Sequence, residues 1–497
     1  MYISTRGGVN PVTASKAIYQ GLAPDGGLFV PQTVPSVSQD FIAKLSEMTY
    51  RQLAKEIFSL YLDDFSEEEI DRVVTAAYGD NFDDVEIAPL HSLDEKSHIL
   101  ELWHGPTAAF KDMALQALPH LLTTSMEKQE PDKEVVILVA TSGDTGKAAL
   151  EGFSDVAKTK IIVFYPNGGV SEVQRLQMVT TTGKNTSVIA VEGNFDDCQN
   201  GVKAIFNDGE FAKTLEAKGY RLSSANSINW GRLLPQIVYY FKAYSALVKN
   251  GAMKAGEVMD VVVPTGNFGN ILAAYYGKVM GLPVGRLICA SNKNNVLTDV
   301  LNTGEYNRNR EFFRTVSPSM DILISSNFER FVFEVNGRNS EDIRSLFGAL
   351  VKDGVYCLDD DTVKRMSDVM CGYFTDEDDT LATIGKIYQE NQYLIDTHTA
   401  VAVNALEQFR ANKHDKIVTV VDSTANPYKF NKAVYEAINQ AGSSDNMDEF
   451  AISAALERQT GVAIHRGLLD LDKKEVLHKK VVKKENMQSA VAEILGV

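Results

Sequence analysis

Short apolar runs, each followed by a turn and then by a helical pattern, dominate the middle of the chain. Three of them follow one another at residues 135–139, 161–164 and 188–191. Strands that are buried on both faces are apolar throughout, and their alternation with helices is typical of a parallel sheet. The same pattern recurs at three later places, residues 261–263, 287–290 and 417–421. The chain is therefore predicted to be an α/β protein built on parallel sheets.

Changes in this pattern divide the chain into four predicted units. Residues 1–93 have apolar positions at helical spacing and are expected to form a helix-rich N-terminal auxiliary domain. Two α/β domains follow, at residues 94–255 and 256–440, and residues 441–497 form a C-terminal helical extension. We find no internal repeat and no low-complexity linker, so these boundaries rest on pattern alone.

The chain is acidic, with 49 lysines and arginines against 66 aspartates and glutamates and a net charge of −17 over 497 residues. Such a charge repels nucleic acid and anionic membranes, so we expect neither as a partner, and any anionic ligand needs a local cluster of donors. The acidic segments at 359–361 and 376–379 are interpreted as solvated loops or helix starts. Calcium binding is a minor alternative because EF-hand spacing is absent.

Four widely spaced cysteines argue against a disulfide framework and against a zinc module, and no metal site is expected. The N-terminus lacks the basic start and apolar stretch of a signal peptide. The longest apolar runs fall far short of the roughly 18 residues of a membrane span. These features together predict a reduced, cytoplasmic protein.

Three turns between a predicted strand and a predicted helix are rich in Gly, Ser, Thr and Asn, and such turns direct free backbone N–H groups at an anion. The first, residues 141–146, is followed by Lys147 and so is similar to a Walker phosphate loop. The match fails because Thr141 stands where that loop needs glycine and Ala148 where it needs a hydroxyl. A nucleotide triphosphatase is therefore not expected.

The second turn, residues 264–270, has two glycines that let the backbone approach a ligand and leave several N–H groups facing one point. A phosphate monoester fits such a cradle. The alternative interpretation is a tight turn that merely needs a positive φ at Gly266 and Gly269.

The third turn, residues 223–232, combines hydroxyls, carboxamides and an arginine before a helix expected at 233–247. Helix capping explains Ser227 or Asn229 but not so many hydrogen-bonding side chains in one run. We interpret it as a polar small-molecule site. Arg232 can grip a carboxylate or phosphate with two parallel hydrogen bonds, and Arg175, in a helix capped by Ser171, is another candidate.

The segment 104–112 carries Lys111 directly after Phe110. Partial desolvation lowers the pKa of a lysine and frees the amine as a nucleophile and base, although lone lysines usually face solvent. A candidate amine, a phosphate cradle and several polar turns at strand ends are the parts that pyridoxal phosphate needs.

These segments resemble one family in sequence and in order. The similar segments are GLAPDGGLFVP at 21–31, HGPTAAFKD at 104–112, ATSGDTG at 140–146, SANSINWGRL at 224–233 and TGNFGN at 265–270. They are similar to the threonine synthases of the longer bacterial and fungal type, pyridoxal-phosphate enzymes of the tryptophan synthase β-like fold. The resemblance implies αβα layers with parallel sheets in two domains, plus the helix-rich N-terminal domain.

The resemblance also assigns the cofactor site. It implies that Lys111, in the 94–255 domain, binds pyridoxal 5'-phosphate covalently and then moves protons, and that Thr424 is the hydroxyl partner of the pyridine nitrogen. It places the cofactor phosphate on the turn of the 256–440 domain, at Gly266, Asn267, Phe268, Gly269 and Asn270. Asn426 stands where the family usually has histidine, so any role of an imidazole there is lost.

The activity that the resemblance implies is the conversion of O-phospho-L-homoserine and water to L-threonine and phosphate, by γ-elimination and β-addition of water. The expected substrate residues are Ser142, Gly143, Asp144 and Thr145 for the carboxylate, and Lys147, Arg175, Ser224, Asn226, Ser227, Asn229 and Arg232 for the phosphate. Members of the family are monomers or homodimers. Two alternatives stay open: a dehydratase or β-replacement enzyme on the same fold, and a catalytically silent relative that binds phosphorylated ligands.

Overall fold

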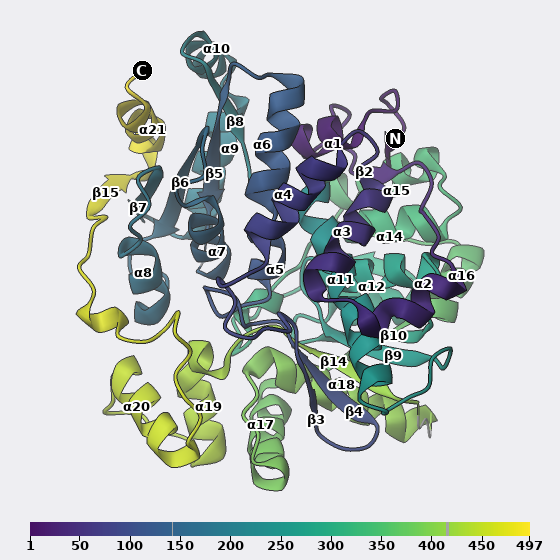
Figure 1. The fold of residues 1–497 in the computed structure, drawn as a ribbon. Coiled ribbons are helices and arrows are strands. Elements are labelled where there is room, and N and C mark those ends of the chain that lie inside the picture. The colour runs from purple at the N-terminus through teal and green to yellow at the C-terminus, as the bar shows by residue number, and fades with distance from the viewer. Residues whose placement is uncertain (142, 414–416) are drawn as a thin grey trace.

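Two sheets form the framework of the computed structural model, which describes residues 1–141, 143–413 and 417–497 (Figure 1). The larger sheet has the order β13 (Met370–Phe374), β10 (Val284–Ser291), β9 (Met259–Pro264), β14 (Thr419–Ser423), β4 (Ser97–Glu101) and β3 (Leu90–Ser92). Its neighbouring strands are parallel except for the edge pair β3 and β4. The smaller sheet has the order β15 (Lys480–Lys483), β7 (Thr186–Glu192), β6 (Thr159–Pro166), β5 (Glu134–Ala140) and β8 (Tyr220–Ser223), and is parallel throughout.

All six apolar runs of the sequence are strands of these sheets, and the predicted parallel α/β class is confirmed. The central strands lie between helical layers, so both of their faces are buried. Val261, Val262 and Val263 of β9 each have 0% exposure. Burial on both faces explains why these runs show no polar alternation.

Helices cover both sheets and connect their strands. Those around the smaller sheet are α5 (Lys111–Leu115), α6 (Leu118–Gln129), α7 (Asp144–Phe153), α8 (Glu172–Val179), α9 (Phe195–Asn207) and α10 (Gly209–Ala217). Those associated with the larger sheet are α12 (Gly269–Val279), α13 (Val296–Thr303), α14 (Phe328–Val335), α15 (Ser340–Lys352), α16 (Asp360–Val369), α17 (Glu377–Asn391) and α18 (Thr397–Lys413). Asp359 and Asp376 cap α16 and α17, so the two acidic segments are helix starts, as predicted.

The N-terminal segment is helix-rich, as its pattern predicts. It contains β1 (Tyr2–Ser4) paired with β2 (Phe29–Pro31), and the helices α1 (Ala14–Gln20), α2 (Gln39–Lys44), α3 (Tyr50–Tyr61) and α4 (Glu67–Ala77). Capping boxes begin α3 at Thr49 and α4 at Ser66, because each side chain accepts from a backbone N–H that the helix leaves unpaired. These helices pack on α6 and on α11 (Trp230–Lys249), the long helix predicted at 233–247.

The last part of the C-terminal segment runs along the edge of the smaller sheet, beside β7 (Figure 1). The helices of the segment are α19 (Asn431–Ile438), α20 (Glu449–Thr460) and α21 (Met487–Leu495), and β15 pairs with β7. The predicted extension thus adds a strand to the sheet of residues 134–223, and β4 joins strands of the 256–440 unit. The division into four units stays a prediction. Strands from different predicted units pair within each of the two sheets. Among the described residues we find no helix that is long and apolar enough to cross a membrane.

Candidate active site

The polar turns singled out in the sequence all follow the carboxyl ends of strands. They come after β5 and β8 of the smaller sheet, and after β9 and β14 of the larger one. The segment that follows β4 carries Lys111 and meets the end of β14 through an antiparallel bridge between Ala109 and Ala425. Carboxyl ends of parallel strands are where α/β folds bind ligands. The fold therefore brings turns that are far apart in the sequence to the ligand-binding edges of both sheets.

Lys111 is the first residue of α5, and its position is fixed by a bond from the Phe110 N–H to the Thr424 carbonyl (2.8 Å). Its side chain is 12% exposed. The amine Nζ donates to Ser319 Oγ (3.3 Å) and lies 3.8 Å from Asp144 Oδ2. Burial lowers the pKa of Lys111 below that of a free lysine, and the carboxylate of Asp144 opposes this shift only in part. This is the desolvated amine that the sequence suggested.

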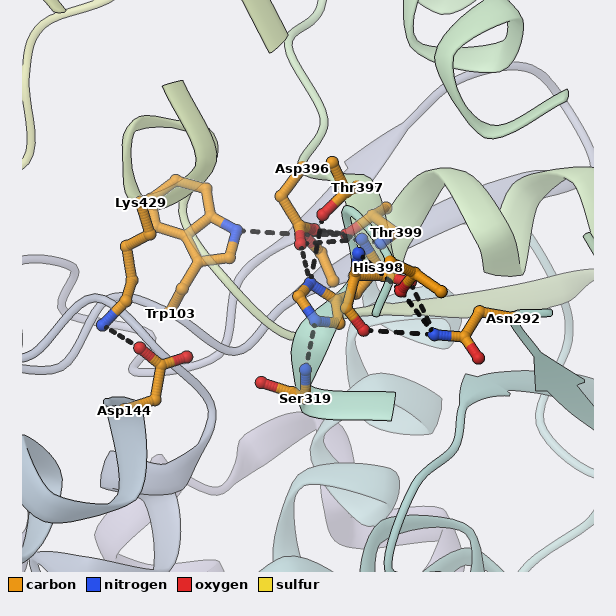
Figure 2. Close-up of polar contacts among 12 residues, drawn as sticks. Trp103, Asp144, Asn292, Ser319, Asp396, Thr397, His398, Thr399 and Lys429 are labelled. Atoms are coloured by element: carbon orange, nitrogen blue, oxygen red, sulfur yellow. Dashed lines mark hydrogen bonds and ion pairs between the residues drawn. The ribbon is translucent and has the colours of Figure 1, made fainter. Parts of the chain in front are cut away.

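Asp144 is paired with a buried lysine that the sequence analysis did not single out. Lys429 Nζ lies 2.9 Å from Asp144 Oδ1 and also donates to the Thr107 carbonyl (3.0 Å), as Figure 2 shows for the ion pair. Burial alone would raise the pKa of Asp144, but Lys429 and Lys111 lower it well below its usual range. Asp144 is therefore ionised, and its charge is neutralised by Lys429.

The turn before α7 is shaped by Thr141 and Gly143. Thr141 Oγ1 accepts from the N–H groups of Gly143 (3.0 Å) and Gly146 (2.9 Å). Gly143 has φ of +146°, and a Cβ there would lie 2.5 Å from the amide of Gln174, so the position requires glycine. The turn presents the first N–H groups of α7, as an anion site needs. Ser142, which was predicted to contact substrate, lies outside the described residues.

In the second turn, between β9 and α12, Gly266 is required because a neighbouring backbone segment lies close to it, and not because of its φ angle. The interpretation that Gly266 and Gly269 merely supply a positive φ is wrong, because the positive φ of +64° belongs to Phe268. A Cβ on Gly266 would come within 2.5 Å of the Ser319 carbonyl. Phe268 tolerates its conformation because its ring is buried against Phe328 and Phe331.

Asn327 joins this second turn to the third. Its N–H (3.1 Å) and Nδ2 (2.9 Å) both donate to the Asn267 carbonyl, and Nδ2 also donates to the Ser227 carbonyl (3.2 Å). Arg330 holds Asn327 through Oδ1 (2.6 Å) and binds the Ile228 carbonyl (2.7 Å). The two turns are therefore fixed relative to each other before any ligand binds.

Asn270 directs its side chain away from the cradle into a buried network. Its Nδ2 donates to Asp422 Oδ2 (2.9 Å), and the Tyr240 hydroxyl lies 2.6 Å from Asn270 Oδ1 and 2.7 Å from Asp422 Oδ2. Burial raises the pKa of Asp422 to about 7. Because these contacts use the amide of Asn270, only its backbone N–H, in the first turn of α12, is left for an anion.

Arg232 is the most unusual group of the third turn. It is 6% exposed, its Nη1 donates to the Ala225 carbonyl (2.7 Å), and its Nε has no partner among the described residues. Burial lowers the pKa of Arg232 to about 10. A buried guanidinium without a counter-ion is costly, so the site is built for an anion that is not part of the chain.

The other residues of this turn that were predicted to bind phosphate differ in their exposure and in the hydrogen bonds that they already make. Asn226 is exposed, Ser224 is half-buried, and Ser227 Oγ lies 3.4 Å from Ser326 Oγ. Asn229 caps α11 by accepting from the Gly231 N–H (2.8 Å), and donates to the Ile18 carbonyl (2.9 Å). The capping interpretation is therefore correct for Asn229, and its amide also ties the helix start to the N-terminal segment.

Lys147 and Arg175 already have partners of their own. Lys147 Nζ lies 2.7 Å from Glu151 Oε2, one turn along α7. Arg175 binds Glu172 with Nε (2.7 Å) and Nη2 (2.6 Å), and Glu172 raises its pKa. Ser171 does cap this helix. Neither cation has a contact with Lys111 within the described structure.

Three family models match the chain. They describe the threonine synthase N terminus (residues 1–78), the pyridoxal-phosphate dependent enzymes (residues 85–357) and the threonine synthase C-terminal region (residues 399–483). A threonine synthase of Pseudomonas aeruginosa is 40% identical over 442 residues, which cover 88% of this chain and 91% of that protein. The chain belongs to the threonine synthase family.

Other threonine synthase relatives agree with this. The human protein "Threonine synthase-like 1" is 40% identical over 446 residues, 86% of this chain, but the match spans only 59% of that longer protein. The crystal structure of pyridoxal-phosphate-bound threonine synthase from Brucella melitensis superposes with a TM-score of 0.89 at 35% identity, covering 100% of this chain and 99% of that one. The expectations of this family, of its fold and of pyridoxal phosphate as its cofactor are thereby confirmed.

Four residues at this site in the threonine synthase fold escaped the sequence analysis: Ser319, Asp396, His398 and Lys429. Each meets the Lys111 region only through tertiary structure. Asp396 and His398 precede and begin an apolar helix, where Asp396 accepts from the N–H groups of His398 (2.9 Å) and Thr399 (3.0 Å). That capping pattern was visible in the sequence, but nothing there connected it to Lys111.

Proposed function

We propose that this chain converts O-phospho-L-homoserine and water to L-threonine and phosphate. The observation that carries the proposal is Arg232, a buried cation without a counter-ion in a chain of the threonine synthase family. Such a group favours a substrate with a dianionic phosphate over one without it. The Pseudomonas aeruginosa relative and the Brucella melitensis structure carry the name of this activity.

The residues present fit pyridoxal phosphate. Lys111 supplies a buried amine, and the N–H groups of residues 266–270 supply the phosphate cradle. The Thr424 hydroxyl makes no hydrogen bond within the described part of the chain, which leaves it for the pyridine nitrogen. When bound, the cofactor delocalises the electrons left after a proton departs from the carbon next to the substrate amine. A neutral hydroxyl at the ring nitrogen tempers this effect, since it favours the charged ring less than a carboxylate would.

Lys111 is the proposed proton carrier. Because burial lowers its pKa, the neutral amine would be available to accept a proton from the α-carbon of the substrate. Asp144, 3.8 Å away, stabilises the ammonium form while the proton is held. Lys429 keeps Asp144 ionised and neutralises its charge. Asp144 therefore does not hold Lys111 permanently in the charged form.

The substrate's two anions are proposed to bind at different turns. The N–H groups in the first turn of α7, at Asp144 and Thr145, take the carboxylate, and Gly143, whose N–H is held by Thr141 Oγ1, lets the substrate approach them. Ser142, also expected from the sequence, lies outside the described residues. Lys429 removes the repulsion that Asp144 would exert on it. Arg232 takes the phosphate, with Ser224, Asn226 and Ser227 beside it. Lys147, Arg175 and Asn229 were also expected from the sequence, and each must leave or share its present partner to contribute.

We further propose a cytoplasmic monomer or homodimer that acts on this small molecule and binds neither nucleic acid nor membrane. The net charge of −17 supports the last two points. A dehydratase or β-replacement activity on the same fold is the second candidate, and Arg232 is the observation against it, since such substrates lack a γ-phosphate.

The test is phosphate release from O-phospho-L-homoserine by the purified holoenzyme, with the amino-acid product identified. We expect equal amounts of threonine and phosphate. The Lys111→Ala variant should lose at least about a thousandfold in turnover, as enzymes without their central nucleophile do. Dehydration of serine or threonine, with no phosphate release, would instead support the second candidate.

A further inference from the structure

Ser319 lies between the two halves of the cofactor site. It belongs to a short 3-10 helix, η2 (Pro318–Met320), inside a long connection between α13 and α14. Its Oγ accepts from Lys111 Nζ (3.3 Å), and its carbonyl faces Gly266, where a Cβ would approach it to 2.5 Å. A shift of Ser319 would therefore move the partner of the amine and one wall of the cradle together.

His398 holds Ser319 from the other side (Figure 2). The Ser319 N–H donates to His398 Nε2 (3.1 Å), and Nδ1 of the same ring lies 2.7 Å from Asp396 Oδ2. A ring nitrogen that accepts from an amide N–H carries no proton, so the ring proton is on Nδ1 and is donated to Asp396. His398 is 2% exposed and Asp396 0%. The geometry thus admits one neutral tautomer of His398.

The same helix start also reaches the end of β14. Thr399 Oγ1 lies within hydrogen-bond distance of Ser423 Oγ (2.9 Å), which accepts from Trp103 Nε1 (3.0 Å). Ser423 directly precedes Thr424, the proposed partner of the ring nitrogen. Residues 396–399 therefore fix two points that flank the cofactor site, and His398 is the member that acts on the lysine side.

We propose that His398, locked in this tautomer by Asp396, is a positioning residue that acts through Ser319 on Lys111. His398 fixes the backbone of Ser319, and Ser319 Oγ sets the direction of the Lys111 amine. The proposal rests on pyridoxal phosphate as cofactor and not on the identity of the substrate. It therefore survives if the proposed function is wrong.

Three substitutions separate positioning from simple packing. Gln in His398→Gln can keep an acceptor at the place of Nε2, whereas His398→Phe keeps the ring volume and removes the acceptor. Asp396→Asn presents an NH₂ group either to the ring N–H or to the Thr399 N–H, so one donor must oppose another. His98→Gln is the matched control, because His98 is also buried and bonds Ser92 (2.8 Å), away from Lys111.

The decisive measurement is the pH titration of the bound cofactor's absorbance in the holoenzyme. A simple packing defect would leave the midpoint of this titration unchanged. The titration reports the charge balance around Lys111, to which Asp144 of α7, Asp112 of α5, Arg232 of α11 and Lys429 contribute. We expect His398→Phe and Asp396→Asn to shift the titration midpoint by about one pH unit, and to lower kcat about tenfold at nearly constant KM. His398→Gln and His98→Gln should stay within about twofold of the parent in kcat.

A second route covers the case in which His398→Phe does not fold. Ser319→Ala removes the hydroxyl directly and should shift the midpoint in the same direction as Asp396→Asn. An unchanged midpoint in Ser319→Ala and Asp396→Asn would overturn the proposal. So would a His398→Gln variant with the full defect alongside an unaffected Ser319→Ala.

Discussion

The two sides of the active site are built in opposite ways. On the lysine side, Lys111, Asp144, Lys429, Ser319 and His398 are linked by ion pairs and hydrogen bonds within the chain. On the other side, the turn at 223–232 ends in Arg232, whose Nε has no partner and which has no carboxylate within ion-pair distance among the described residues.

This difference reflects what each side must do. The lysine side has to hold a permanent cofactor and move protons, which demands groups fixed before the substrate arrives. The Arg232 side has to take up and release an anion at each turnover. A partner within the chain would compete with that anion, so its absence favours binding at a cost in stability.

Breaking the lysine side should have the largest effect on folding. Lys429→Met leaves the buried carboxylate of Asp144 without its 2.9 Å partner, and breaking a buried pair costs about 3–5 kcal/mol of unfolding free energy. Denaturant unfolding of the holoenzyme checks this. Asp144→Asn combined with Lys429→Met should recover much of the loss, because no unpaired charge remains. A single variant as stable as the parent would show that the pair is not formed.

Substitution of Arg232 should weaken substrate binding without lowering the free energy of unfolding. We expect Arg232→Met to lower kcat/KM for O-phospho-L-homoserine about a hundredfold, as expected when a buried partner of a ligand charge is removed. Its unfolding free energy should be unchanged or higher, because a desolvated charge has been deleted.

Arg330 is the matched control for Arg232. It is also buried, and burial lowers its pKa to about 10 as well, but its guanidinium donates to the Phe29 carbonyl, Asn327 Oδ1 and the Ile228 carbonyl. Arg330→Met should therefore destabilise the fold. If the two arginine variants behaved alike, the contrast between the two sides would be lost.

The sequence predicted those parts of the site that follow from local sequence pattern, which are the strand-to-helix turns and Arg232. An apolar run followed by a glycine-rich turn and a helix specifies its own structure, so the turns after β5, β8 and β9 were located correctly. Arg232 was identified for the same reason, since it follows its turn directly. Local pattern does not show what a side chain contacts, however, and Lys147, Arg175 and Asn229 were predicted to bind phosphate alongside Arg232, although the first two are paired with glutamates and the third with the Ile18 carbonyl.

The lysine side was predicted only at Lys111 and Asp144. Ser319 lies in a connection without apolar periodicity, and its place is fixed by buried polar contacts such as that of Asn292 Nδ2 with Ser317 Oγ (3.0 Å). The local sequence around Lys429 does not distinguish it from other lysines near a helix start, because its burial arises only from the tertiary fold. These positions depend on packing between segments hundreds of residues apart, and no local pattern records such packing.

A further test concerns the pH dependence of stability on the lysine side. His104, seven residues before Lys111, has Nδ1 2.5 Å from Asp83 Oδ1 and Nε2 2.7 Å from Glu101 Oε2. Burial alone would lower the pKa of His104, but the two carboxylates raise it to about 9. The unfolded chain has a histidine pKa of about 6.5.

A pKa that is higher in the folded state means that the folded chain binds the proton more tightly. The stabilisation from His104 is therefore complete below about pH 6.5 and is lost as the pH rises through about 9. Unfolding free energies measured across this range should fall in the parent and fall less steeply in His104→Gln. His91→Gln, which alters a ring stacked on Tyr393, should keep the parental slope. Equal slopes in all three chains would mean that His104 is not held as a cation between Asp83 and Glu101.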